Sequence, residues 1–148
     1  MKPCVILLVE DDPNDAFFVS RALKDLGFDG KLEHLTDAFK AREYLAGAGI
    51  YSDREKYPLP EIIVSDSSLP GRGSGIELLE WMRKDPNLTE APFIMLSGEI
   101  TNEVRKRATA AGVKLLLRKG SNFRDTATAL REALLQMPEQ CRTWLKLS

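Results

Sequence analysis

The stretch Ile62-Ile63-Val64-Ser65-Asp66-Ser67-Ser68-Leu69-Pro70 contains the strongest structural signal in this chain. It begins with a short apolar run, places a carboxylate directly after that run, and ends at a Leu-Pro pair typical of a turn. Short apolar runs bounded by turn residues are typical of strands that are buried on both faces of a parallel sheet. We therefore predict a central strand over Ile62–Ser65, with Asp66 at its carboxyl end.

Further strands are expected on both sides of this run. Continuous apolar runs occur at Val5–Val9, Phe93–Leu96 and Val113–Leu117, and a weaker, alternating run near a sheet edge occurs at Lys31–Leu35. Helix start signals separate these runs, at Asp12 before Pro13, at Thr36, at Ser74 with Glu77, at Thr101 and at Ser121. Strands that alternate with helices predict an α/β fold, here a doubly wound, five-stranded parallel sheet with helices on both faces.

The composition fits one compact soluble domain. The 148 residues suffice for one hydrophobic core, and we assign residues 1–137 to the domain and 138–148 to a short C-terminal extension. Hydrophobic residues make up 43% and charged residues 29%, which argues against disorder, and a net charge of -1 argues against nucleic-acid binding. The apolar run Cys4–Val9 is too short to span a bilayer, so we expect a cytoplasmic protein with no membrane partner.

Two cysteines, Cys4 and Cys141, lie near opposite ends of the chain. A disulfide between them is compatible with this number, and a reduced cytosolic protein fits as well or better. The sequence alone leaves both alternatives open.

Charged and hydroxyl side chains follow the predicted strands at the edge where parallel α/β sheets bind their ligands. In chain order they are Glu10, Asp11, Asp12, Asp66, Ser97 and Lys119. Crowded carboxylates repel one another by about 4 kcal/mol per pair at about 4 Å in a medium of effective dielectric about 20, and Mg2+ relieves that repulsion. A carboxylate beside a bound cation can attack phosphorus and form an acyl phosphate. Ser97 could donate a hydrogen bond to a phosphoryl oxygen, and Lys119 could neutralise another.

Each of these residues also has an ordinary structural explanation when it is taken alone. The acids after the first strand favour a helix N-terminus, Asp66 suits a turn, Lys119 suits a solvated surface, and Ser97 before a glycine suits a loop. Their joint occurrence after strands of one sheet argues for a functional site.

With these motifs, the chain resembles the receiver domain of two-component response regulators over nearly its whole length. The resemblance rests on Val5–Val9 with Glu10 and Asp11, on the segment around Asp66, on Phe93–Ser97, and on Gly112–Lys119. It implies a flavodoxin-like fold and a protein that is not an enzyme beyond promoting its own phosphorylation and dephosphorylation.

The resemblance also implies a role for each site residue. Asp66 would accept a phosphoryl group from a histidine kinase, and Ser97 and Lys119 would bind the phosphoryl oxygens. Mg2+ would be held by Glu10, Asp11, Asp66 and the backbone carbonyl of Ser68. Ser68 and Glu99 occupy positions that tune the phosphoryl lifetime in the family.

Several features are similar to lone receivers that are paired with phytochrome-like kinases. These are the run Asp11-Asp12-Pro13-Asn14-Asp15, the long segment Gly47–Pro60, and a tail with Trp144. Such relatives imply a homodimer through the fourth helix, fifth strand and fifth helix. Because only residues 138–148 follow the predicted domain, output would pass through a downstream protein target or a phosphotransfer protein.

The chain departs from the family pattern near its fifth strand. Gly120 follows Lys119 where the family usually has a proline after a cis peptide, so we expect a trans bond and an altered loop. Leu116 stands where the family usually has an aromatic switch residue, so the coupling through that ring is absent. The loop Gly71–Gly75 is one residue longer than the common form.

Other functions fit less well. A pseudo-receiver, which binds proteins without phosphorylation, is favoured by Leu116 and Gly120 but disfavoured by the intact acidic site. A Mg2+-dependent phosphatase would need a second acid where Ser68 stands. A dinucleotide site would need a glycine where Ile76 stands, and a flavin phosphate would be repelled by the acidic first loop. His34, the single histidine, is expected to be structural, and the basic run Arg105–Arg107 to form a solvated face.

Overall fold

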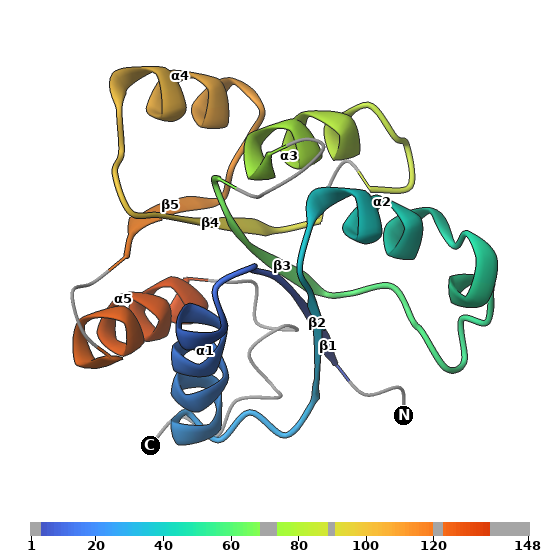
Figure 1. Ribbon diagram of the computed structural model, residues 1–148, viewed down its shortest axis with the longest axis horizontal. Coiled ribbons are helices and arrows are strands. Elements are labelled where there is room, and N and C mark those ends of the chain that lie inside the picture. The colour runs from blue at the N-terminus through green and yellow to red at the C-terminus, as the bar shows by residue number, and fades with distance from the viewer. Residues whose placement is uncertain (1–3, 69–73, 89–90, 120–122, 137–148) are drawn as a thin grey trace.

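The computed structural model describes residues 4–68, 74–88, 91–119 and 123–136 (Figure 1). Strands and helices alternate along the chain. The strands are β1 (Val5–Val9), β2 (Lys31–Leu35), β3 (Ile62–Asp66), β4 (Phe93–Ser97) and β5 (Leu115–Arg118). The helices are α1 (Pro13–Asp25), α2 (Ala38–Ala46), the short 3-10 helix η1 (Gly49–Ser52), α3 (Gly75–Arg83), α4 (Asn102–Ala110) and α5 (Phe123–Leu135).

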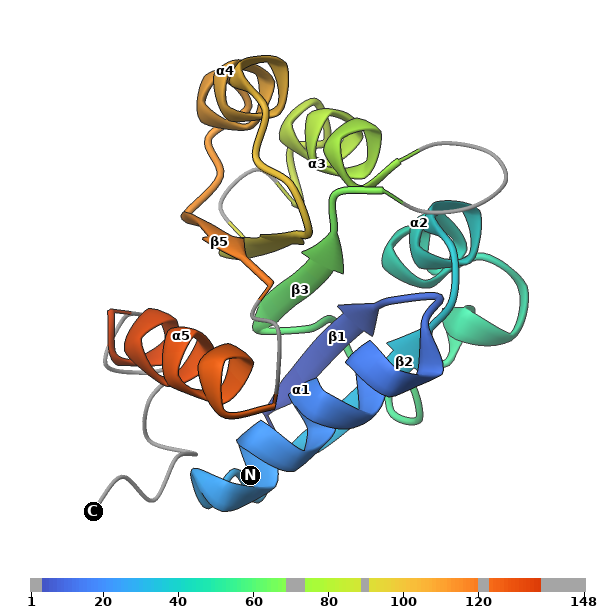
Figure 2. The same ribbon diagram turned by 60° about the vertical axis from the view of Figure 1, so that its left-hand side comes forward.

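The five strands form one parallel sheet in the order β2-β1-β3-β4-β5. Helices α1 and α5 cover one face of this sheet, and α2, α3 and α4 cover the other (Figures 1 and 2). The predicted doubly wound α/β fold is therefore confirmed. None of the helices within the described ranges is both long enough and apolar enough to cross a bilayer.

The strands are apolar throughout because each must fill two cores. Successive side chains of a strand point to opposite faces. Ile6 and Leu8 of β1 pack toward α1 and α5, whereas Leu7 and Val9 pack toward α2 and α3. All four side chains are buried, and the burial of each contributes about 1.5–3 kcal/mol to stability.

Most of the predicted helix starts are confirmed by hydrogen bonds. Asp12 Oδ1 accepts the backbone N–H of Asn14 at 2.8 Å and caps α1. Ser74 caps α3 and Thr101 caps α4 through their side-chain oxygens. The assignment of Thr36 was wrong, because α2 begins one residue later and Asp37 accepts the N–H of Lys40 at 2.7 Å. The prediction at Ser121 lies outside the described residues.

The fifth strand differs from its prediction in position and in burial. It begins at Leu115 rather than Val113, because the turn after α4 passes through Gly112 with φ 74° before pairing with β4 starts. The strand was expected to be buried on both faces, but it is an edge strand and its residues are half-buried or exposed. The weaker strand β2 forms the opposite edge, as its alternating pattern predicted.

The long connection between α2 and β3 is built around one cation. The guanidinium of Arg54 donates to the carbonyls of Tyr44 and Leu45, both at 2.9 Å, and to that of Tyr57 at 3.2 Å. The buried Tyr44 hydroxyl donates to the Pro58 carbonyl at 2.7 Å. These bonds attach the connection to the end of α2 although it contains only one short 3-10 helix.

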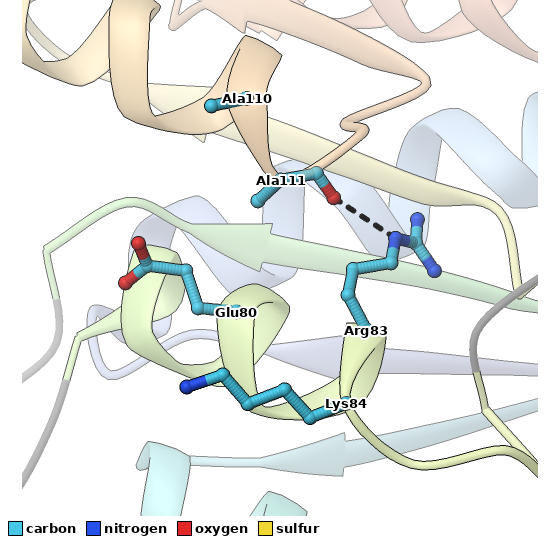
Figure 3. A pocket seen from close by; sticks show the side chains of 5 residues that line it. All are labelled: Glu80, Arg83, Lys84, Ala110 and Ala111. Atoms are coloured by element: carbon cyan, nitrogen blue, oxygen red, sulfur yellow. Dashed lines mark hydrogen bonds between the residues drawn. The ribbon is translucent and has the colours of Figure 1, made fainter.

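A second cation joins α3 to α4. Arg83 Nε donates to the carbonyl of Ala111 at 3.0 Å, and both residues line a hollow of about 350 Å³ (Figure 3). The other guanidinium nitrogens donate to the carbonyls of Leu88, Ala91 and Gly112 at 3.1–3.4 Å. The carbonyls at the end of α4 are thereby satisfied by a side chain from a neighbouring element.

Candidate functional site

The sheet register brings the predicted site residues to one edge. Val9 of β1 pairs with Ser65 of β3, and Asp66 pairs with Leu96 of β4. Glu10 directly follows β1, and Asp66 and Ser97 end the neighbouring strands β3 and β4, so the three residues lie at one edge of the sheet. Lys119 directly follows β5, and its backbone N–H donates to the Ser97 carbonyl at 2.8 Å.

The ammonium group of Lys119 lies at the centre of the site. Its Nζ is 2.7 Å from Asp66 Oδ2, 2.7 Å from Asp15 Oδ2 and 2.8 Å from Glu10 Oε1. A lysine has three N–H donors, so each of them faces a carboxylate. The Glu10 side chain is 1% exposed, that of Asp66 11% and that of Lys119 16%, so these charges are largely shielded from water.

Burial and charge change the protonation of two groups here. Burial raises the pKa of Glu10 to about 7, and the hydrogen bond with Lys119 only partly opposes this rise. Burial would lower the pKa of Lys119, but its bonds to Asp15, Asp66 and Glu10 outweigh that effect and raise the pKa. The lysine is therefore a permanent cation. The Glu10 carboxylate, in contrast, is buried with too few polar contacts to stabilise its charge fully.

Three of the four predicted metal ligands meet at this point. Glu10, Asp11 and Asp66 each offer a carboxylate oxygen, and these oxygens lie within 4.8 Å of one another. Glu10 Oε1 is buried, and its one polar contact among the described residues is the 2.8 Å ion pair with Lys119, so it has a lone pair to offer. A set of carboxylate oxygens of this kind fits a hard cation such as Mg2+. Ser68 is brought to the same place by its backbone N–H, which donates to Asp66 Oδ1 at 3.0 Å.

The hydroxyl of Ser97 is at the site but is engaged elsewhere. Ser97 is 2% exposed, and its Oγ donates to the carbonyl of Glu99 at 2.6 Å. It also accepts a hydrogen bond from Ser67 Oγ at 2.9 Å. The hydroxyl predicted to bind a phosphoryl oxygen is thus held by two neighbours in this structure.

The start of α3 touches the main chain of Asp66. Gly75 N–H donates to the Ser67 carbonyl at 3.1 Å. A Cβ added at Gly75 would collide with the Asp66 carbonyl oxygen, so this position requires a glycine for close approach rather than for its backbone dihedral angles.

Two nearby residues have the structural roles that were expected of them. His34 Nε2 lies 2.7 Å from the Glu10 carbonyl oxygen, so the histidine supports the backbone of the first loop. Asp12, which follows the acidic pair, uses its carboxylate to cap α1. It does not belong to the cluster of carboxylates that could hold a metal ion.

Asp15 is the site residue that the sequence analysis missed. It lies in the first turn of α1, where an acid is usually explained by the helix dipole. The available signal was its position three residues after Asp12, which places it on the turn of α1 nearest the sheet edge. Its partner Lys119 is 104 residues away in the chain, so no local pattern could pair them.

Comparison with known proteins gives the family. The chain matches the response regulator receiver domain over residues 6–131. It belongs to this family, which serves two-component signalling. A curated relative, the probable methanogenesis regulatory protein FilR2 of Methanothrix harundinacea, is 31% identical over 133 residues, which are 88% of this chain and 81% of the relative.

Solved structures agree with this assignment. The Mn(2+)-bound form of response regulator Rcp1 is 28% identical with a TM-score of 0.81, and the match covers 99% of this chain and 97% of that one. The bacteriophytochrome response regulator RtBRR is 27% identical with a TM-score of 0.75, covering 90% of this chain and 78% of that one.

Proposed function

We propose that this chain is a response regulator whose Asp66 accepts a phosphoryl group from a histidine kinase in a Mg2+-dependent reaction. The observation that carries the proposal is the Asp66 carboxylate, which is placed between a lysine and two further acids at the carboxyl edge of the sheet. Family membership supports the same role.

The chemistry is a transfer between two nucleophiles. A carboxylate oxygen of Asp66 forms a bond to phosphorus while the bond from phosphorus to the kinase histidine nitrogen breaks. The imidazole leaves with that electron pair and takes a proton from water, and Asp66 becomes an acyl phosphate. Such a transfer depends mainly on position and on charge compensation.

The residues of the site would divide these tasks. Glu10, Asp11, Asp66 and the Ser68 carbonyl would hold Mg2+, which would offset the negative charge of the phosphoryl oxygens. The Mn(2+)-bound form of the similar regulator Rcp1 supports a divalent ion here. Lys119 would exchange its contact with Asp66 Oδ2 for one with a phosphoryl oxygen. Ser97 would donate a hydrogen bond from its hydroxyl to another phosphoryl oxygen.

The partners follow from the same comparisons. The similarity to a bacteriophytochrome response regulator supports a phytochrome-like kinase as the phosphoryl donor. Output would pass to a downstream protein or a phosphotransfer protein, from a cytoplasmic domain formed by residues 1–137. A homodimer would use α4, β5 and α5, where the half-buried edge strand and the 40% exposed Leu135 offer apolar surface.

Intact-mass measurement after incubation with acetyl phosphate tests the proposal. We expect one added phosphoryl group in the presence of Mg2+, none with a chelator, and none in the Asp66→Asn variant. If the wild-type protein gains no phosphoryl group and binds no Mg2+ in a titration, the proposal is wrong. The chain would then act as a phosphorylation-independent pseudo-receiver, as Leu116 and Gly120 would allow.

A further inference from the structure

We propose that Ser67 is a positioning residue that holds the Ser97 hydroxyl away from Asp66 and thereby weakens binding of the phosphoryl group. The inference rests on the proposed function of Asp66. It concerns a hydroxyl that neither the metal site nor the phosphoryl contacts of that function use.

Hydrogen bonds hold the Ser67 backbone at both its N–H and its carbonyl group. Its backbone N–H donates to the Leu96 carbonyl at 2.9 Å, and its carbonyl accepts the N–H of Gly75 at 3.1 Å. The side chain is therefore directed from the end of β3 toward β4, where Oγ donates to Ser97 Oγ at 2.9 Å. Ser67 is 7% exposed and Ser97 2% exposed, so water competes little for either hydroxyl.

The two hydroxyls and one carbonyl form a directed chain. The Ser67 hydroxyl donates to Ser97 Oγ. The single hydroxyl proton of Ser97 is donated to the Glu99 carbonyl, at 2.6 Å. To donate to a phosphoryl oxygen on Asp66, the Ser97 side chain must rotate about its Cα–Cβ bond, which moves Oγ as well as its proton away from Glu99 and from Ser67 Oγ. The Ser67 hydroxyl then loses its acceptor in a buried place, and a buried donor without a partner is costly.

Binding of the phosphoryl group breaks two hydrogen bonds of these hydroxyls and replaces only one of them. The bond from Ser97 to Glu99 is replaced by a bond to the phosphoryl group, but the bond from Ser67 to Ser97 has no replacement. Ser67 therefore stabilises the unphosphorylated arrangement only. Removing its hydroxyl removes that preference and leaves the phosphoryl contacts intact.

Titration with beryllofluoride and Mg2+, a stable mimic of the phosphoryl group, measures this preference. We expect the Ser67→Ala variant to bind beryllofluoride about two- to tenfold more tightly than the wild-type protein, the range that corresponds to one neutral hydrogen bond. The Ser67→Cys variant keeps the volume of the side chain with a weak donor and should shift in the same direction.

A double-mutant cycle separates this role from a general structural one. The Ser97→Ala variant should bind beryllofluoride less tightly, and adding Ser67→Ala to it should change nothing further. Equal tightening by Ser67→Ala with and without Ser97, or no tightening at all, would overturn the inference.

Ser65→Ala is the matched control, because this buried hydroxyl on the same strand donates to the Asp66 carbonyl at 2.9 Å. If it tightens binding as much as Ser67→Ala does, the inference is also wrong. A wild-type protein that neither binds beryllofluoride nor gains a phosphoryl group would contradict the proposed function instead.

Discussion

Lys119 and Arg83 are both surrounded by oxygen atoms, but the oxygens differ in kind. Lys119 faces the carboxylates of three side chains, at 2.7–2.8 Å. Arg83 faces backbone carbonyls from the end of α4 and from the connection between α3 and β4. One cation is placed among charges, and the other among neutral dipoles.

Because of this difference, we expect the contacts of Lys119 to be exchangeable and the contacts of Arg83 to be fixed. The carboxylates around Lys119 could equally bind a metal ion, and the lysine itself could move to a phosphoryl oxygen. The carbonyls around Arg83 are main-chain groups at the end of α4 and in the connection after α3, and a carbonyl that is buried without a donor is costly. We expect substitutions at the first cation to change chemistry and those at the second to change stability.

Lys119→Met should have the largest effect. The charge that compensates the transferred group is lost, so we expect phosphorylation by acetyl phosphate to slow by roughly 10²- to 10³-fold. Stopped samples analysed by intact mass give the rate. Without Mg2+ the variant should also unfold more easily, by about 3 kcal/mol, because buried carboxylates lose their counter-ion. A rate within tenfold of wild type would contradict the exchangeable role.

Arg83→Ala should change stability instead. Several carbonyls lose a charged donor at once, so the free energy of unfolding should fall by about 2–4 kcal/mol in urea denaturation. The rate of phosphorylation should stay within about twofold of wild type, and Mg2+ should not reverse the loss. The neighbouring Lys84→Ala, at an exposed position beside the same hollow, is the control, with an expected change below about 0.5 kcal/mol.

Glu10→Gln tests the cost of the buried carboxylate. The pKa of Glu10 is raised from 4.5 to about 7 in the folded protein, so its folding contribution is most favourable below pH 4.5 and is lost as the pH rises through 7. Without metal at pH 8, the variant should therefore be more stable than wild type, by up to about 2–3 kcal/mol, with a smaller difference at pH 5. Saturating Mg2+ should reverse the order, because the variant has lost one of the proposed carboxylate ligands and binds the ion more weakly. A variant less stable than wild type at pH 8 without metal would contradict this account.

Asp15→Asn should have the smallest effect of the four. The Asp15 side chain is 32% exposed, so its pair with Lys119 contributes at most about 1 kcal/mol to folding. Because Lys119 would lose its contact with α1, we expect phosphorylation to slow by about two- to fivefold, as measured by intact mass. Asp25→Asn, at the other end of α1 and paired with Arg21 at the surface, should leave the rate unchanged.

The fold was predictable because its signals are local. The apolar runs, the caps at Asp12, Ser74 and Thr101, and the strand-helix alternation each occur within a few residues. The errors were local as well. Thr36 and Asp37 are both good caps, and the sequence does not say which of the two lies at the turn.

The site was only partly predictable because its contacts are long-range. The acids and the lysine after each strand could be placed once the sheet order was known. The role of Asp15 depends on where the first turn of α1 lies relative to β5, and the role of Ser67 depends on the direction of two hydroxyl groups. Both contacts join side chains that are far apart in the chain, so local sequence patterns could not pair them.

The contact between Gly75 and Asp66 has a mechanical consequence. Because no side chain separates the N-terminus of α3 from the Asp66 carbonyl, nothing between them can be compressed to absorb a displacement. A shift of the Asp66 peptide group would therefore push directly on the N-terminus of α3 and move that helix with it. A glycine usually makes a chain more flexible, but here its lack of a side chain stiffens the connection between the acceptor and a helix on the protein surface.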